Sequence, residues 1–168
     1  MTGPLPKALA LSEPAHRPSS KAPLMWATSA AIPWFVAVVA QIAWWVADPA
    51  LGWLHALLAV VTVVGAVLSV GVVPVWRYRV HRWDLDGRAL YTRTGWLMQE
   101  RRIAPISRVQ TVDTHRGPVD RLFGLANVTV TTASSAGAVR VLALDSAVAD
   151  DLVARLTDIA ALGDQDAT

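Results

Sequence analysis

Residues 102–133, RIAPISRVQTVDTHRGPVDRLFGLANVTVTTA, decide the fold of the C-terminal half of the chain. From residue 106 to residue 115 side chains of different character alternate, as they do on the two faces of a β-strand. One face holds Ile106, Arg108, Gln110, Val112 and Thr114. Residues 126–133, ANVTVTTA, alternate in the same way. We therefore predict two strands, separated by a segment that contains Gly117-Pro118 and Gly124.

The flanking residues extend this pattern over residues 77–162. The alternation stops at Asp86-Gly87, which is a hairpin signal, and again at Thr94-Gly95. Residues 138–144 form another alternating run, and residues 146–162 repeat apolar side chains at helical spacing. The pattern predicts six strands, or seven if a long one bends, and one C-terminal helix. We expect a small, mostly antiparallel barrel or sandwich with a capping helix.

Two long apolar segments precede this domain. Between Lys21 and Arg77 the only charged residue is Asp48. Residues 26–47 and 51–74 each have the length of about 20 residues that a membrane-spanning helix needs. We therefore predict a transmembrane helical hairpin over residues 24–76, and an α+β membrane protein as the fold class. The first apolar segment is longer than the core of a usual signal peptide, so we do not expect cleavage.

Tryptophan supports this assignment, because its amphipathic ring favours the headgroup region of a bilayer. The tryptophans near the segment ends are Trp26, Trp44, Trp45, Trp53 and Trp76. Inside the segments, Gln41 can bond across the helix pair, and small residues such as Gly65 and Ser69 allow close helix contact. His55 lies at interfacial depth. We therefore expect these polar residues to serve helix packing rather than a transport path.

Basic residues predict the orientation. They flank the hairpin at Lys21 and Arg77, whereas the connecting turn has none. By the positive-inside rule both termini face the cytoplasm, and the protein lies in the cell membrane. Residues 1–23 contain five prolines and are predicted to be a disordered cytoplasmic tail. Residues 163–168 form a second, shorter tail.

The motif residues within the opening stretch resemble the bacterial membrane-flanked pleckstrin-homology-like (PH-like) family, which is also called YdbS-like. The pattern is a proline-led strand with an Arg-x-Gln step, Gly-Pro, an Arg-Leu-Phe-Gly-Leu turn and an alternating strand. The residues that carry it are Pro105, Arg108, Gln110, Gly117, Pro118, Arg121, Phe123 and Gly124. The resemblance covers roughly residues 26–162. It implies a bent seven-stranded antiparallel barrel that is closed by a C-terminal helix.

Within that fold the motif residues are expected to be structural. Pro118 suits the first turn of a short helix, and Gly124 suits a left-handed end to it. Leu122 and Phe123 are expected to anchor this helix to the barrel. The polar members, Arg108, Gln110 and Arg121, are expected to bond backbone carbonyls or to pair with Asp113 and Asp120.

Charge suggests a contact with lipid. Residues 77–121 contain ten arginines and five acidic residues, a formal charge of +5, whereas residues 122–168 have a formal charge of −4. Basic groups near an anionic leaflet contribute about 1 kcal/mol each. The candidate headgroup contacts are Arg77, Arg79, Arg82, Arg101 and Arg102. An ordinary positive-inside bias explains any one of them equally well. No aromatic platform accompanies the arginines, so nucleic acid is not an expected ligand.

Catalytic motifs are absent from the sequence, which has no zinc-protease signature, Walker loop, dinucleotide fingerprint or nucleophile elbow. Asp113 and His115 share a strand face but lack a third polar partner, so surface pairing is the better interpretation. We expect no enzyme activity, no metal and no cofactor.

Three functions fit these features. The first is a cytoplasmic module that binds a membrane-protein partner or assembles a membrane complex. The resemblance implies as a partner a longer relative with repeated PH-like domains, and a homo-oligomer also fits. The second is a module that responds to anionic lipid, envelope stress or a membrane-active peptide. The third is an accessory subunit of a membrane enzyme or transporter.

Overall fold

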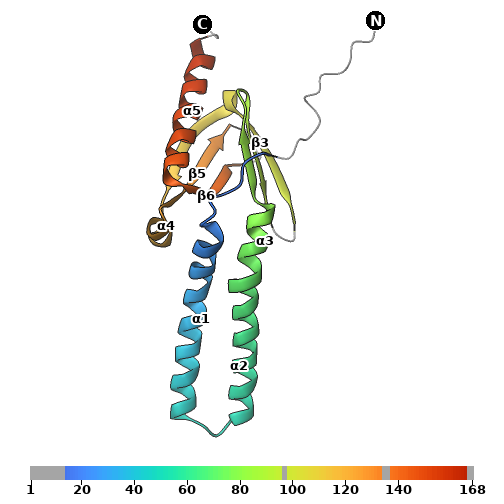
Figure 1. The fold of residues 1–168 in the computed structure, drawn as a ribbon, viewed down its shortest axis with the longest axis vertical. Helices are drawn as coiled ribbons and strands as arrows, with labels where there is room; N and C mark the ends of the chain where they lie inside the picture. Colours follow the sequence, from blue (N-terminus) through green and yellow to red (C-terminus); the bar gives the residue numbers. More distant parts are fainter. Residues whose placement is uncertain (1–13, 96–97, 134–136, 166–168) are drawn as a thin grey trace, which may run out of the picture.

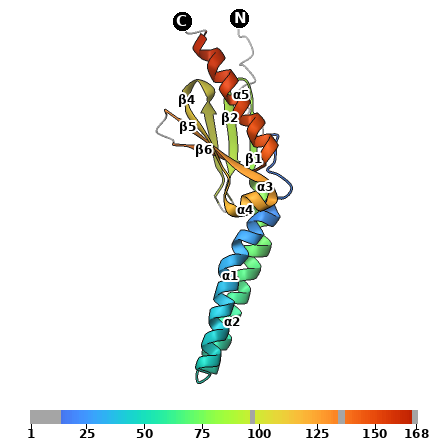
Figure 2. The same ribbon diagram turned by 90° about the vertical axis from the view of Figure 1, so that its left-hand side faces the viewer.

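The protein consists of a long helical hairpin and a β-rich domain that sits at one end of it (Figures 1 and 2). The structure is a computed structural model that describes residues 14–95, 98–133 and 137–165. The first helix, α1, is Ala22–Ala47. The second runs without a break through α2 (Gly52–Ala66), the π-helical segment η2 (Val67–Val72) and α3 (Val73–Val80).

Both helices are long and apolar enough to cross a membrane. Their most apolar windows have mean hydropathies of 1.8 and 2.7, and almost none of either window is buried inside the protein. Helix α1 begins four residues before the predicted start, and the second helix continues six residues beyond residue 74. Pro74, the last residue of the predicted segment, is the second residue of α3, which directly follows the π-helical segment. A proline lacks the backbone donor of a regular turn, and the wider π turn accommodates that loss.

Polar side chains join the two helices. The Gln41 amide donates to the Thr62 hydroxyl, as we predicted for Gln41, and Trp34 Nε1 donates to Ser69 Oγ. Gly65 faces the Trp34 indole so closely that a Cβ at this position would lie 2.2 Å from the ring. The hairpin is therefore held by specific contacts rather than by apolar surface alone.

The domain contains two three-stranded antiparallel sheets. The first has the order β1-β2-β3, from Arg82–Leu85, Ala89–Thr94 and Glu100–Pro105. The second has the order β4-β5-β6, from Val109–His115, Leu125–Thr132 and Val139–Asp145. A 3₁₀ turn, η3 (Ile106–Arg108), separates β3 from β4. The strand predicted from residue 106 therefore begins at Val109.

The predicted order of a hairpin, an antiparallel β domain and a C-terminal helix is confirmed, but the two sheets do not close into a barrel. Helix α5 (Ser146–Gln165) covers the second sheet. Its Leu152 and Leu156 pack into a core with Val128 and Val130 of β5, all of which are essentially inaccessible. Helix α4 (Pro118–Phe123) lies at the base of the domain.

The segment that precedes α1, residues 14–21, crosses from one sheet to the other, and we call it the N-terminal strap. His16 exchanges two backbone hydrogen bonds of 2.9 Å with Trp83 of β1, and Ser19 N donates to Ala143 O of β6 at 2.8 Å. The strap thereby bridges β1 and β6, the two edge strands that a closed barrel would pair directly. The prediction of a disordered tail is wrong for these residues, and residues 1–13 lie outside the described part.

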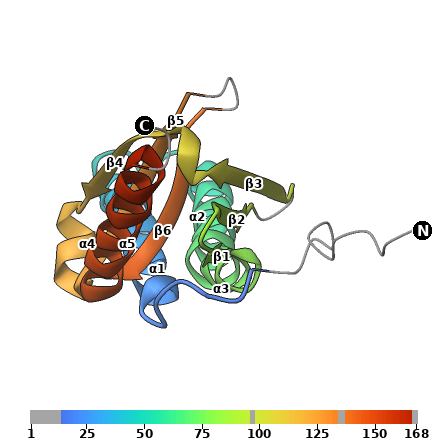
Figure 3. The same ribbon diagram turned by 90° about the horizontal axis from the view of Figure 1, so that it is seen from above.

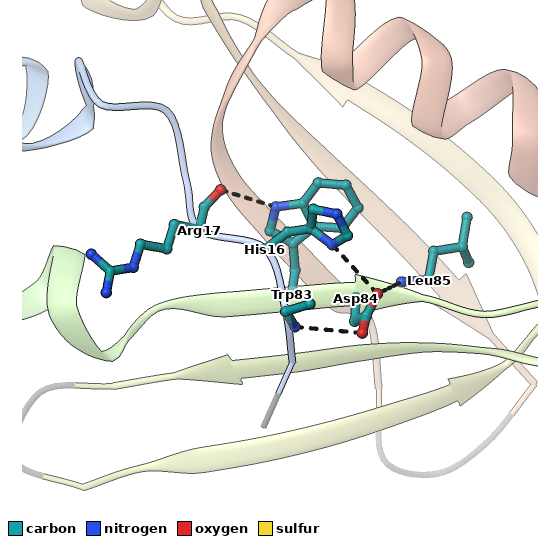
Figure 4. A network of polar contacts seen from close by, with 6 residues as sticks. His16, Arg17, Trp83, Asp84 and Leu85 are labelled. Carbon is teal, nitrogen blue, oxygen red and sulfur yellow. Dashed lines mark hydrogen bonds and ion pairs between the residues drawn. The ribbon is translucent and has the colours of Figure 1, made fainter. Parts of the chain in front are cut away.

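Side chains also hold the strap in place. The His16 ring lies on the Trp83 indole with centroids 5.0 Å apart, and its Nδ1 is 3.4 Å from the Asp84 carboxylate (Figure 4). At the other end, Ser19 Oγ donates to Asp145 at 3.0 Å.

The predicted C-terminal tail, residues 163–168, also differs from the structure, because α5 continues to residue 165; residues 166–168 are not described.

A second apolar cluster connects the domain to the membrane helices. It contains the buried residues Ala22, Met25, Leu125 and Ala143, and Trp26, Tyr78, Val119 and Phe123 pack against it. The first turn of α1 is therefore part of the interior of the domain.

Candidate functional site

A cleft of about 620 Å³ opens between the membrane-proximal end of α3 and the strands β2, β3 and β6. It lies where the two sheets separate instead of closing, so the incomplete barrel creates the space. Its polar lining residues are Arg77, His81, Thr92, Thr94, Glu100, Arg102 and Arg140. Val73, one turn below Arg77 on α3, forms part of the wall. The cleft thus extends to the depth of the membrane helices.

Arg77 is held at one side of the cleft by two aromatic neighbours. Its guanidinium lies 4.4 Å from the centroid of the Trp26 ring, in a cation–π arrangement. Its Nε also donates to His81 Nε2, at a length of 3.5 Å. These contacts fix the guanidinium near the end of the hairpin.

His81 is buried and neutral. Its Nδ1 lies 2.8 Å from the carbonyl oxygen of Arg77. Only 5% of the surface of His81 is exposed. A ring that donates from Nδ1 leaves Nε2 as an acceptor, which matches the bond from Arg77. Burial, together with the positive charge of Arg77, lowers the pKa of His81 to about 4. His81 therefore positions Arg77 without adding charge to the cleft at neutral pH.

Arg102 occupies the opposite wall. Its Nε and Nη2 both donate to Oε1 of Glu100 at 2.7 Å, and its Nη1 donates to Ala138 O at 2.9 Å. Arg140 lines the cleft from β6 and is exposed. The described lining of the cleft therefore contains three arginines and one carboxylate, that of Glu100. Such a lining favours an anion that can accept several hydrogen bonds.

The five predicted headgroup contacts divide between the cleft and the surface. Arg77 and Arg102 come together in the cleft, whereas Arg79 and Arg101 are exposed outside it. Arg82 is half-buried beside a smaller hollow, and its Nε has no hydrogen-bond partner among the described residues. The sequence did not indicate Arg140, because it lies in the half of the chain with a net negative charge.

Three of the family-motif residues around α4 have the roles expected of them: Pro118, Phe123 and Gly124. Pro118 occupies the first turn of α4, and Gly124 ends it with a left-handed φ of 67°. Phe123 packs into the cluster beneath the domain. Leu122 does not anchor the helix, because it is 81% exposed.

Asp120 forms a polar network that the sequence did not reveal. Its Oδ2 accepts from Gly117 N at 2.9 Å and from Asn127 Nδ2 at 3.0 Å. Asn127 Oδ1 in turn accepts from the backbone of Ala143, which has an unusual φ of 54°. Ala143 lies in a β-bulge between β5 and β6, and its carbonyl receives the strap at Ser19. The Gly-Pro turn, the bulge and the strap are therefore connected.

The remaining motif residues lie at the surface. Pro105 ends β3, and Arg108, Gln110 and Arg121 are exposed. Within the described residues their side chains form none of the expected bonds to carbonyls, Asp113 or Asp120, and Asp113 accepts from Thr111 instead. His115 is exposed. In the parts of the chain that the structure describes, no group of three metal-ligating side chains occurs.

Comparisons with known proteins agree with this architecture. A family model described as "Bacterial PH domain" matches residues 22–159, which include the helical pair. The UPF0699 transmembrane protein YdbS of Bacillus subtilis (strain 168) is 32% identical over 115 residues. That alignment covers 63% of this chain and 69% of the relative. No solved structure matches the chain.

Proposed function

Because the chain belongs to the bacterial PH domain family, we propose that it is a non-catalytic membrane protein whose PH-like domain binds anionic lipid headgroups. The headgroups come from the membrane that holds its own helices. The observation that carries this proposal is the cleft in which Arg77, Arg102 and Arg140 meet beside α3.

The depth of the cleft supports a headgroup as its ligand. Trp26 and Trp44 are separated by 18 residues of α1, or about 27 Å at the rise of an α-helix, close to the thickness of the hydrocarbon core. The membrane boundary on the domain side therefore lies near Trp26 and, on the other helix, near Trp76. Arg77 follows Trp76 directly in sequence and Val73 lies three residues before it, so a phosphate at this boundary can reach the cleft directly.

The electrostatic balance also supports an anionic ligand. The three arginines outnumber Glu100, and His81 remains neutral at physiological pH. A phosphate that displaces Glu100 from Arg102 can accept two parallel hydrogen bonds from the guanidinium, one on each of two oxygens. Both termini are placed on the cytoplasmic side in this proposal, where anionic lipids create a negative surface potential.

A short-chain lipid titration tests the proposal on the full chain in a zwitterionic detergent. We expect dihexanoyl-phosphatidylglycerol to bind measurably by calorimetry and dihexanoyl-phosphatidylcholine to bind at least tenfold more weakly. Arg140→Gln should weaken binding of the anionic lipid about tenfold, which corresponds to about 1.4 kcal/mol for a lost charge-assisted contact.

Arg155→Gln is the matched control, because Arg155 is an exposed arginine on α5 that pairs with Asp151 outside the cleft. Its affinity should equal that of the wild type. Equal binding of the two lipids, or an unchanged affinity in Arg140→Gln, would reject the cleft as a headgroup site. Recognition of a protein partner, including a longer relative with repeated domains, remains a prediction that co-purification in mild detergent can test.

A further inference from the structure

Among the leucines of the domain whose exposure the structure describes, Leu122 is the most exposed, although Val119 and Phe123 of the same short helix are packed. It is 81% exposed. Its neighbours Val119 and Phe123 contact the cluster that contains Ala22 and Met25 of α1. A single exposed leucine is common on protein surfaces, so its position relative to the membrane helices decides what it contacts.

The position of α4 identifies that surface. Val119 and Phe123 pack in the same cluster as Trp26, the tryptophan that marks the membrane boundary on α1. In two views at right angles, α4 lies at the base of the domain, beside the first turns of α1 (Figures 1 and 2). The helix therefore lies at headgroup depth.

The local structure fixes the direction of α4. Pro118 begins the helix, Gly124 ends it in the left-handed conformation, and Asp120 bonds both Gly117 and Asn127. With Phe123 turned into the cluster, Leu122 and Arg121 remain on the exposed side. An arginine beside an exposed leucine suits a membrane interface, where the apolar group enters and the cation stays with the phosphates.

We propose that α4 is a membrane-interfacial contact: Leu122 inserts between lipid headgroups, and Arg121 binds their phosphates. Seen from above, α4 and the cleft strand β3 lie on opposite sides of the hairpin (Figure 3). Together with the headgroup cleft proposed above, this contact would place lipid on both sides of the helices. The occupant is lipid because α4 packs on the first turn of α1, next to Trp26 at the membrane boundary. This contact does not depend on the specificity of the arginine cleft.

Site-specific fluorescence tests the contact, since the chain contains no cysteine and any introduced thiol is unique. We suggest labelling Leu122→Cys with the environment-sensitive dye NBD in proteoliposomes of phosphatidylcholine and phosphatidylglycerol. The emission should be blue-shifted, and lipids with a shallow doxyl group should quench it at least twofold more than iodide does.

Gly87→Cys provides the control. Gly87 is exposed at the β1–β2 turn, and a Cβ there meets nothing within 4 Å. The pocket beside it is lined by Arg155, Asp158 and Ile159, which belong to the C-terminal half of α5. A dye at this position should respond to iodide and not to doxyl lipid. The proposal is overturned if the dye at residue 122 behaves like the dye at residue 87. It is also overturned if that dye is shielded from both quenchers, which would indicate contact with another protein chain.

Discussion

Replacement of Gly65 by alanine should loosen the helical hairpin by about 1–3 kcal/mol. An added Cβ would lie 2.2 Å from Cη2 and 2.7 Å from Cζ2 of Trp34, so the indole has to move. Overpacking of this kind costs about 1–3 kcal/mol. The displaced ring also loses its hydrogen bond to Ser69, which is worth about 0.6 kcal/mol within a membrane. The better helix propensity of alanine offsets up to about 1 kcal/mol of this loss.

Gly71→Ala is the matched control, because it lies on the same helix and a Cβ there meets nothing within 4 Å. Unfolding of both variants can be followed in mixed micelles by titration with a denaturing detergent. Gly71→Ala should be neutral or slightly stabilising. In the Gly65→Ala background, a second change of Trp34→Phe should restore part of the stability by shrinking the ring. The reasoning fails if Gly65→Ala is as stable as Gly71→Ala.

Three further predictions concern the domain. Because the pKa of His81 is lowered from 6.5 to about 4, the unfolded chain binds more protons between these values. The free energy of unfolding should therefore fall by up to about 3 kcal/mol from pH 7 to pH 4, and His81→Gln should flatten that slope in urea titrations. Asn127→Ala should cost about 1–3 kcal/mol by leaving the buried Ala143 donor unpaired, whereas Thr129→Ala on the same strand face should cost less. Ser19→Ala should cost about 1 kcal/mol and speed hydrogen exchange in the strap, and unchanged exchange would contradict the role of its hydroxyl.

The membrane helices and the strand pattern could be predicted because their signals are local. Length and the absence of charge define the hairpin, and alternation defines β5, whose buried residues occur at every second position over most of its length. Pro118 and Gly124 were correctly placed at the ends of a short helix, because backbone geometry alone selects them. The family predicted from these residues is confirmed.

The strap and the cleft depend on contacts between distant residues, which no local pattern encodes. The strap is held largely by backbone hydrogen bonds to Trp83 and Ala143, and its proline-rich composition is typical of disorder. Arg140 reaches the cleft only because β6 lies beside the gap between the sheets. Leu122 was assigned to the interior because the two neighbouring residues, Leu122 and Phe123, are both apolar, and only the direction of α4 distinguishes them.

The junction between the hairpin and the domain has a mechanical consequence. A single residue, His81, separates the end of α3 from the start of β1, and the first turn of α1 is enclosed by the domain. The part of α1 between Trp26 and Trp44 spans about 27 Å, and membrane helices adjust their tilt to the thickness of the bilayer. Because neither connection between the helices and the domain contains a flexible linker, we expect a change in helix tilt to rotate the whole domain. A thinner or thicker membrane therefore lowers one rim of the domain toward the lipid and raises the other.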